Sequence, residues 1–316
     1  SGSLEGVNRM ASAAGPDQSV YYVPAQGWYP VWLAFGLMLM VTGLASVLNM
    51  QKTGGSAEWT QSLVGFAIVA FVFFRWFAKV IQENAEGYNN AQLKKSYVWG
   101  MGWFIFSEVM FFAAFFGALF YVRMWVVPWL GGEGSKSIVG DYLWPEFEAT
   151  WPVVSNPNPE IFENPGQSMA PPALGAAWLT YLPFLNTVIL LSSSVTVHMA
   201  HLAINTQERG KIAGWLGFTV LLGVIFLGLQ VLEYYEAYAH MGLTLASGIY
   251  GSTFFILTGF HGFHVTMGTV ILLIQFFRVL KGHFKEHDCF GFEAASWYWH
   301  FVDVVWVGLF IFVYVL

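Results

Sequence analysis

The chain has 316 residues, of which 56% are hydrophobic and only 10% are charged, whereas about 25% of the residues of an ordinary soluble domain are charged. The net charge of −6 and the single cysteine, Cys289, exclude a nucleic-acid-binding protein, a disulfide-stabilised scaffold and a thiolate metal cluster. The composition indicates an integral membrane protein.

Seven apolar stretches are long enough to cross a bilayer as helices, which takes about 20 residues. They do not alternate polar and apolar residues as the strands of a membrane barrel do. The sequence therefore predicts an all-α bundle, a single membrane domain over residues 1–316. Its seven transmembrane helices are expected at Val31–Met50, Trp59–Val80, Val98–Val127, Leu182–Ile204, Ala213–Tyr238, Ile249–Leu280 and Phe292–Leu316.

The distribution of basic residues predicts the orientation of the chain, because Lys and Arg gather on the inner side of a membrane. With the N-terminus inside, only Lys52, Arg123 and Lys136 fall outside, which leaves ten of the thirteen Lys and Arg residues inside. We therefore expect an inner N-terminus and an outer C-terminus. Residues 128–172 then form a long external loop that is acidic and rich in proline. We expect this loop to be irregular, and either solvated or a docking surface for a basic partner.

Ionisable side chains inside the predicted helices are costly in a bilayer and therefore carry most of the functional information. Glu108 lies near the middle of the third span, where it either carries protons or joins two helices through hydrogen bonds. In the last span, His300 and Asp303 are three residues apart and share a helix face, with Glu293 on nearly the same stripe. They form either a proton relay or a polar seam between helices.

Two His-x-x-His pairs, His198 with His201 and His261 with His264, place two imidazoles on one helix face. A metal is one interpretation, since imidazole is a common metal ligand. However, neither a Glu-x-x-His nor a His-Glu-x-x-His pattern accompanies the pairs. We therefore expect no metal site, and we expect His261 and His264 to form hydrogen bonds in the core.

Two kinds of charged cluster mark the predicted helix ends. Glu233 and Glu236 stand at the outer end of the fifth span, where we expect either a solvated helix end or a contact with another subunit. Basic pockets at the inner leaflet can bind anionic lipid headgroups, whereas extension of the side chains toward water is the alternative. The candidate lipid ligands at the inner ends of the second and sixth spans are Arg75, Lys79, Arg278, Lys281 and His283.

Several motifs follow one another in a fixed order along residues 60–316, outside the 128–172 loop. They are Ser107-Glu108-Val109, Pro183-Phe184-Leu185-Asn186-Thr187, Glu233-Tyr234-Tyr235-Glu236, Thr258-Gly259-Phe260-His261-Gly262 and Trp297-Tyr298-Trp299-His300-Phe301-Val302-Asp303. This ordered set resembles subunit III of the haem–copper cytochrome c oxidases.

The resemblance implies a seven-helix subunit without a cofactor or redox centre of its own, seated with subunit II beside a subunit I that carries haem and copper. Cytochrome c is then the electron donor of the complex. The first two helices would be split from the other five by a cleft that holds phospholipids, with Arg278, Lys281 and His283 as headgroup ligands. Glu108 matches the buried glutamate of the family. The family supports proton uptake and sustained turnover of the complex during oxygen reduction. The location is then a bacterial plasma membrane or a mitochondrial inner membrane.

Three alternatives stay open at this stage. The first is a standalone proton or solute transporter that uses Glu108 and Asp303. The second is the related subunit of a quinol oxidase. The third is an intramembrane metalloenzyme built on the two His-x-x-His pairs.

Overall fold

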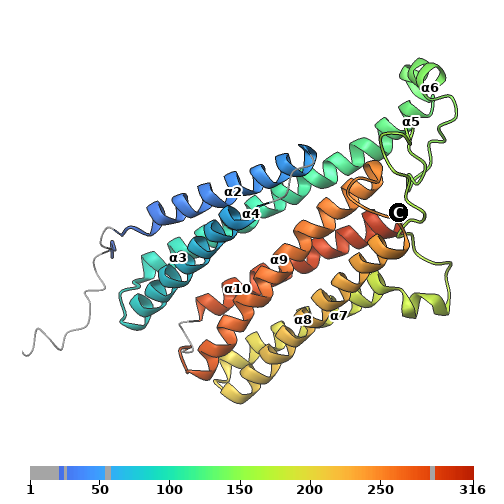
Figure 1. Ribbon diagram of the computed structural model, residues 1–316. Coiled ribbons are helices and arrows are strands. Elements are labelled where there is room, and N and C mark those ends of the chain that lie inside the picture. Colours follow the sequence, from blue (N-terminus) through green and yellow to red (C-terminus); the bar gives the residue numbers. More distant parts are fainter. Residues whose placement is uncertain (1–20, 25–26, 54–57, 285–288) are drawn as a thin grey trace, which may run out of the picture. The chain divides into compact units, whose positions relative to one another are not determined.

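The computed structural model describes residues 21–24, 27–53, 58–284 and 289–316 (Figure 1). The predicted inner N-terminus, residues 1–20, lies outside the described residues. Within them the chain is helical without a β-strand, and seven helices are long and apolar enough to cross a membrane. The predicted all-α membrane architecture is confirmed at this level.

The observed helices agree with the predicted spans to within a few residues at most ends. They are α2 (Tyr29–Thr53), α3 (Thr60–Ala85), α4 (Ala91–Tyr121), α7 (Leu182–Asn205), α8 (Arg209–His240), α9 (Gly248–Leu280) and α10 (Phe290–Leu309). α4 continues through a π-helical turn at Val122–Val126 into α5 (Val127–Leu130), and α10 continues into a second π-helical segment at Phe310–Val315.

The largest boundary difference is at the start of α4, which begins at Ala91 instead of Val98. The Asn90 side chain accepts a hydrogen bond of 2.9 Å from the backbone N–H of Leu93 and so caps the helix. The added turns are polar, and hydropathy therefore locates only the apolar part of this helix.

Two compact units make up the chain, residues 1–97 and residues 98–316. In the first unit α2 and α3 pack side by side in opposite directions, and small residues line their contact. A Cβ added at Gly65 would lie 2.8 Å from the carbonyl oxygen of Gly36. Ser62 Oγ donates a hydrogen bond of 3.0 Å to the carbonyl oxygen of Met40. Close backbone approach through small residues is a usual way of packing helices in membranes.

In the second unit α7, α8, α9 and α10 pack together (Figure 1). Trp299 of α10 is among the largest fully buried side chains of their core. The indole ring of this fully buried residue lies against Gly223 of α8 and Gly268 of α9. Its Nε1–H donates a hydrogen bond of 2.9 Å to Ser193 Oγ of α7. One side chain of α10 therefore touches the three other helices of the core.

The second unit also contains the greater part of α4, which contacts α9 and α10 through long side chains. The Phe111 and Phe260 rings meet edge to face, with centroids 5.0 Å apart. The Phe104 and Tyr298 rings stack at 6.1 Å. Phe112 is buried in the core of the unit.

The 128–172 segment contains more regular structure than its prolines suggest. A short helix, α6 (Ser137–Leu143), follows a 3₁₀ turn at Gly134–Lys136. The expectation of a wholly irregular loop is wrong here, because the stretch between Pro128 and Pro145 contains no proline that would interrupt a helix.

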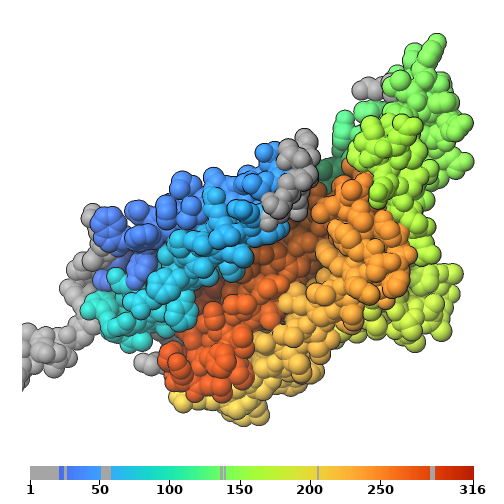
Figure 2. All heavy atoms as spheres, in the orientation of Figure 1, coloured from blue at the N-terminus to red at the C-terminus, as the bar shows by residue number. Residues whose placement is uncertain are grey.

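The same segment is fastened to the end of the bundle at several points. Asn156 Nδ2 donates a hydrogen bond of 3.3 Å to the carbonyl oxygen of Ser247. The backbone N–H of Gly166 donates to the carbonyl oxygen of Met241 at 2.8 Å. Figure 2 shows the yellow-green atoms of this segment against the orange start of α9. Part of the predicted solvated loop is therefore packed as structure.

Candidate functional site

Glu108 forms the most direct polar contact between α4 and α9. Its Oε2 lies 2.9 Å from Nε2 of His264, and the other ring nitrogen of His264, Nδ1, lies 2.7 Å from the carbonyl oxygen of Phe260. The rings of Phe112 and Phe301 pack around the imidazole, with centroids 5.1 and 6.3 Å away. The pair therefore lies among aromatic side chains, and both ring nitrogens of His264 have a hydrogen-bond partner.

The geometry of this pair requires one proton between the two side chains. A carbonyl oxygen can only accept, so Nδ1 of His264 carries a hydrogen and donates it to Phe260. If the ring is neutral, its Nε2 is bare and accepts a hydrogen from the Glu108 carboxyl. If the ring is an imidazolium, Nε2–H donates to a Glu108 carboxylate. In both states a single proton lies between Oε2 and Nε2.

His300 and Asp303 lie together on α10 as the three-residue spacing predicts. Nδ1 of His300 is 2.8 Å from Ser194 Oγ of α7 and 3.7 Å from Oδ2 of Asp303. The two carboxyl oxygens of Asp303 are buried and find no hydrogen-bond partner among the described residues. The contact with Ser194 makes this pair part of the α7–α10 interface.

Glu293 has other partners than the His300–Asp303 pair. Its Oε1 accepts a hydrogen bond of 3.3 Å from Cys289 Sγ and lies 4.0 Å from Nε2 of His201. It lies about two turns before His300 on α10, near His201 of α7, one turn or more from Ser194.

The two His-x-x-His pairs do not converge. His261 is fully buried, and its Nε2–H donates to the carbonyl oxygen of Val302 at 3.2 Å, whereas His264 bonds Glu108. His198 is exposed on α7. In the part of the chain that the structure describes, no three His, Cys, Asp or Glu side chains gather as a metal ion would require.

In the basic cluster at the end of α9, Arg278 contacts other side chains of the chain. Arg278 Nη1 donates a hydrogen bond of 2.9 Å to Gln275 Oε1, and the guanidinium carbon lies 4.5 Å from the centroid of the Phe284 ring. Lys281 and His283 are exposed. Arg209 of α8 joins this cluster, because its guanidinium carbon would lie 2.8 Å from a Cβ added at Gly282. The sequence does not show this approach, because it depends on how α8 and α9 pack.

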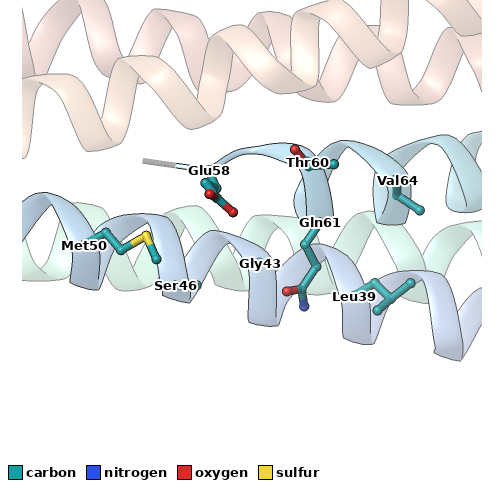
Figure 3. A pocket seen from close by; sticks show the side chains of 8 residues that line it. All are labelled: Leu39, Gly43, Ser46, Met50, Glu58, Thr60, Gln61 and Val64. Atoms are coloured by element: carbon teal, nitrogen blue, oxygen red, sulfur yellow. The ribbon is translucent and has the colours of Figure 1, made fainter. Parts of the chain in front are cut away.

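Two grooves open along α2 and α3. One has a volume of about 690 Å³, is lined mostly by apolar side chains from Tyr29 to Val72, and includes Arg75. Lys79, one turn further along α3, lies 3.8 Å from Glu83. Figure 3 shows the other groove, of about 320 Å³, where Glu58 and Gln61 accompany apolar side chains.

Glu233 is a buried acid, whereas the sequence predicts a solvated helix end or a contact with another subunit at this position. Its residue is only 1% exposed, and Oε1 accepts a hydrogen bond of 2.6 Å from the hydroxyl of Tyr314. Glu236 is exposed. Glu233 is therefore neither solvated nor free to contact another subunit. It continues the buried stripe of α8 with Phe226 and Gln230, at the spacing of three and four residues that identifies a core face.

Comparison with known proteins adds to this geometry. The family described as cytochrome c oxidase subunit III matches residues 20–138 and 159–316. Relatives named cytochrome c oxidase subunit 3 from Cyprinus carpio and Gadus morhua are each 35% identical to this chain over 295 residues. The relative of that name from Gazella subgutturosa is 36% identical over 295 residues. Each match covers 93% of this chain and 96% of the relative.

Proposed function

The chain belongs to the cytochrome c oxidase subunit III family, and from this premise we propose that it is the non-redox subunit of a proton-pumping oxidase. In this role it binds phospholipids, supports the structure of the complex and sustains proton uptake by a subunit I that holds haem and copper. Subunit II is the other large partner, and cytochrome c is the electron donor. The membrane is a bacterial plasma membrane or a mitochondrial inner membrane.

The Glu108–His264 pair is the observation that supports this role most directly. It holds one proton in a hydrogen bond of 2.9 Å between two helices. Such a pair can fasten α4 to α9 while also keeping a proton available inside the membrane. Among the described residues no hydrogen bond connects it to Asp303, which a transporter using both acids would need.

The partners of the buried imidazoles support a chain without a redox centre of its own. His261 bonds a backbone carbonyl, His264 bonds Glu108, and His300 bonds Ser194. Both ring nitrogens of His264 are engaged, so an iron or copper ion bound there would have to displace Glu108 or the Phe260 carbonyl. We propose that haem and copper belong to the partner subunits and that this chain contributes phospholipid sites only.

Lipid binding draws support from two groups of basic residues, one in each unit of the chain. The groove that includes Arg75 combines apolar walls with a guanidinium group, which suits an acyl chain and a phosphate. At the end of α9, Lys281 and His283 are exposed beside Arg278 and Arg209. The inner N-terminus, the outer C-terminus and the lipid-filled cleft stay predictions.

The first test replaces Glu108 by Ala in the purified oxidase complex, which removes the hydrogen bond to His264. We expect subunit retention and lipid content to fall more than the initial rate of electron transfer, with the haem spectrum unchanged. Thr266→Val is the control, since Thr266 is exposed two residues from His264 and bonds only within its own helix. An immediate loss of turnover with retention and lipid content unchanged would assign Glu108 a direct catalytic role instead.

Two further outcomes would contradict the proposal as a whole. Stoichiometric haem or copper on the isolated chain would show a redox centre, and proton flux from the chain alone in liposomes would show a transporter. Purification with a complex that oxidises quinol instead of cytochrome c would assign the chain to the quinol oxidase branch.

The second test concerns the lipid ligands. Arg278→Gln combined with Lys281→Gln removes two cations from the α9 cluster, so we expect fewer anionic phospholipids per purified complex, counted by mass spectrometry. Lys211→Gln is the control, because Lys211 is exposed and already pairs with Glu208 at 2.8 Å. An unchanged lipid count in the double variant would remove this cluster from the proposal.

A further inference from the structure

Three buried polar side chains near one end of α7 and α8 have polar atoms without a hydrogen-bond partner among the described residues. Asn186 is 0% exposed, Gln230 6% and Glu233 1%. Both polar atoms of Asn186, both of Gln230, and Oε2 of Glu233 find no hydrogen-bond partner among the described residues. Buried polar atoms in folded proteins are nearly always hydrogen-bonded, so a group of five such atoms requires an explanation.

The register of the two helices brings these side chains to one level. Thr196 Oγ1 and Thr219 Oγ1 are 2.7 Å apart across the antiparallel α7–α8 pair. Asn186 lies ten residues before Thr196, and Gln230 lies eleven residues after Thr219. Because every residue advances a helix by the same rise, Asn186 and Gln230 stand at about the same level of the two helices. Glu233, three residues after Gln230, neighbours it on the same face.

Neighbouring side chains close this space from two sides. On one side, Trp306 donates a hydrogen bond of 3.0 Å to Thr187, the residue after Asn186, and packs edge to face on Phe226 at 4.8 Å. On the other side, the hydroxyl of Tyr314 donates to Oε1 of Glu233 at 2.6 Å. The Trp306 and Tyr314 rings are themselves 6.0 Å apart, so these contacts place the three buried side chains near one aromatic wall of the core.

The 128–172 segment covers the outer side of this space through Met169. The backbone N–H of Met169 donates to the hydroxyl of Tyr250 at 3.0 Å, and its carbonyl oxygen accepts from the hydroxyl of Tyr181 at 2.7 Å. Burial raises the pKa of Tyr181, and the nearby Glu233 and Tyr250 raise it further. Both capping tyrosines therefore lie within electrostatic reach of Glu233.

We propose that Asn186, Gln230 and Glu233 form an internal water-binding site, which the tyrosine-held Met169 closes. The chemistry of the five atoms favours water. The two amide nitrogens can only donate, and the amide oxygens accept, whatever the protonation state of Glu233. A metal cation would engage the oxygens and leave the nitrogens unpaired. A water molecule donates and accepts, and internal waters typically make about three hydrogen bonds each.

The test is a high-resolution map of the intact oxidase complex, with wild-type chain and with an Asn186→Leu, Gln230→Leu double variant. In the wild type we expect ordered density within hydrogen-bond distance, about 2.7–3.2 Å, of at least two of the three side chains. In the double variant we expect that density to be lost. Thr196→Val is the control, because the Thr196 hydroxyl is satisfied by Thr219 and the Ser193 carbonyl, and the density should persist.

A second measurement keeps the test decisive if the double variant does not assemble. Hydroxyl radicals generated by X-rays from bound water label adjacent side chains, and mass spectrometry locates the labels. In the wild-type complex we expect labelling at Tyr314 well above that at Tyr298, an equally reactive and similarly buried tyrosine sixteen residues earlier in α10.

Three results would overturn the proposal. They are direct pairing of the Asn186 and Gln230 amides without intervening density, density at metal–oxygen distances of about 2.3–2.6 Å, and labelling of Tyr314 no greater than that of Tyr298. Each outcome refers to this site alone, so it is independent of the proposed role of the subunit.

Discussion

The α2–α3 pair and the α7–α10 bundle hold their helices together by different means. Within α2 and α3 only 17% and 11% of the membrane-spanning windows are buried, whereas 39% is buried in α9 and 56% in α10. The α2–α3 contact depends on backbone approach at residues such as Gly65, with Ser62 and Gln61 providing side-chain hydrogen bonds across it. Most side chains of this pair point away from their partner helix.

The bundle uses polar side chains at nearly every level of its interfaces. Because lipid is as apolar as the helix surfaces, burial of apolar area does little to drive helix association in a membrane. Helix association therefore depends on close packing and on hydrogen bonds. A unit with many such bonds can therefore bury its helices, whereas a closely packed pair leaves broad apolar faces outward. The bonds between helices include Trp299–Ser193, Trp306–Thr187, Thr196–Thr219, Tyr234–Thr258 and Tyr314–Glu233.

The largest expected effect is that of Trp299→Ala in the bundle. The change removes the ring that touches three helices and leaves Ser193 without its donor, so we expect a destabilisation of about 3–5 kcal/mol. Heating the purified complex and following release of this subunit measures it. Trp297→Ala, two residues away on an exposed face, should have a much smaller effect. Equal losses in both variants would contradict the central role of Trp299.

Gly65→Leu tests whether close backbone approach holds α2 against α3. Because its Cβ would lie 2.8 Å from the Gly36 carbonyl oxygen, we expect overpacking to cost about 1–3 kcal/mol. Limited proteolysis of the residues that join the two helices should become faster. Gly214→Leu in α8, where an added Cβ meets no atom within 4 Å, is the control. Proteolysis at the wild-type rate would show that the pair does not depend on this contact.

The smallest expected effect is that of one hydrogen bond in the bundle. Thr196→Val removes the 2.7 Å bond to Thr219, which we expect to cost about 0.6 kcal/mol, the average for such bonds between membrane helices. A double-mutant cycle with Thr219→Val measures the coupling directly. A coupling as large as the Trp299 effect would mean that single polar bonds dominate the bundle.

The sequence alone predicts the membrane character, the seven spans and the pairing of His300 with Asp303. Each of these follows from short-range patterns: about 20 apolar residues cross a bilayer, and residues three apart share a helix face. The ordered motifs also indicate the protein family. The 128–172 segment shows where such patterns fail, because proline content describes a whole segment and conceals the proline-free stretch that forms α6.

Only the tertiary structure decides which polar groups meet across helices. Glu108 lies 156 positions from His264 in the sequence, and Glu233 lies 81 from Tyr314. Neither partner can be read from spacing along one helix, because both contacts depend on which helices are neighbours and on their register. Hydropathy specifies that a residue lies in the membrane, whereas packing specifies whether its side chain faces lipid, a partner or an internal polar site.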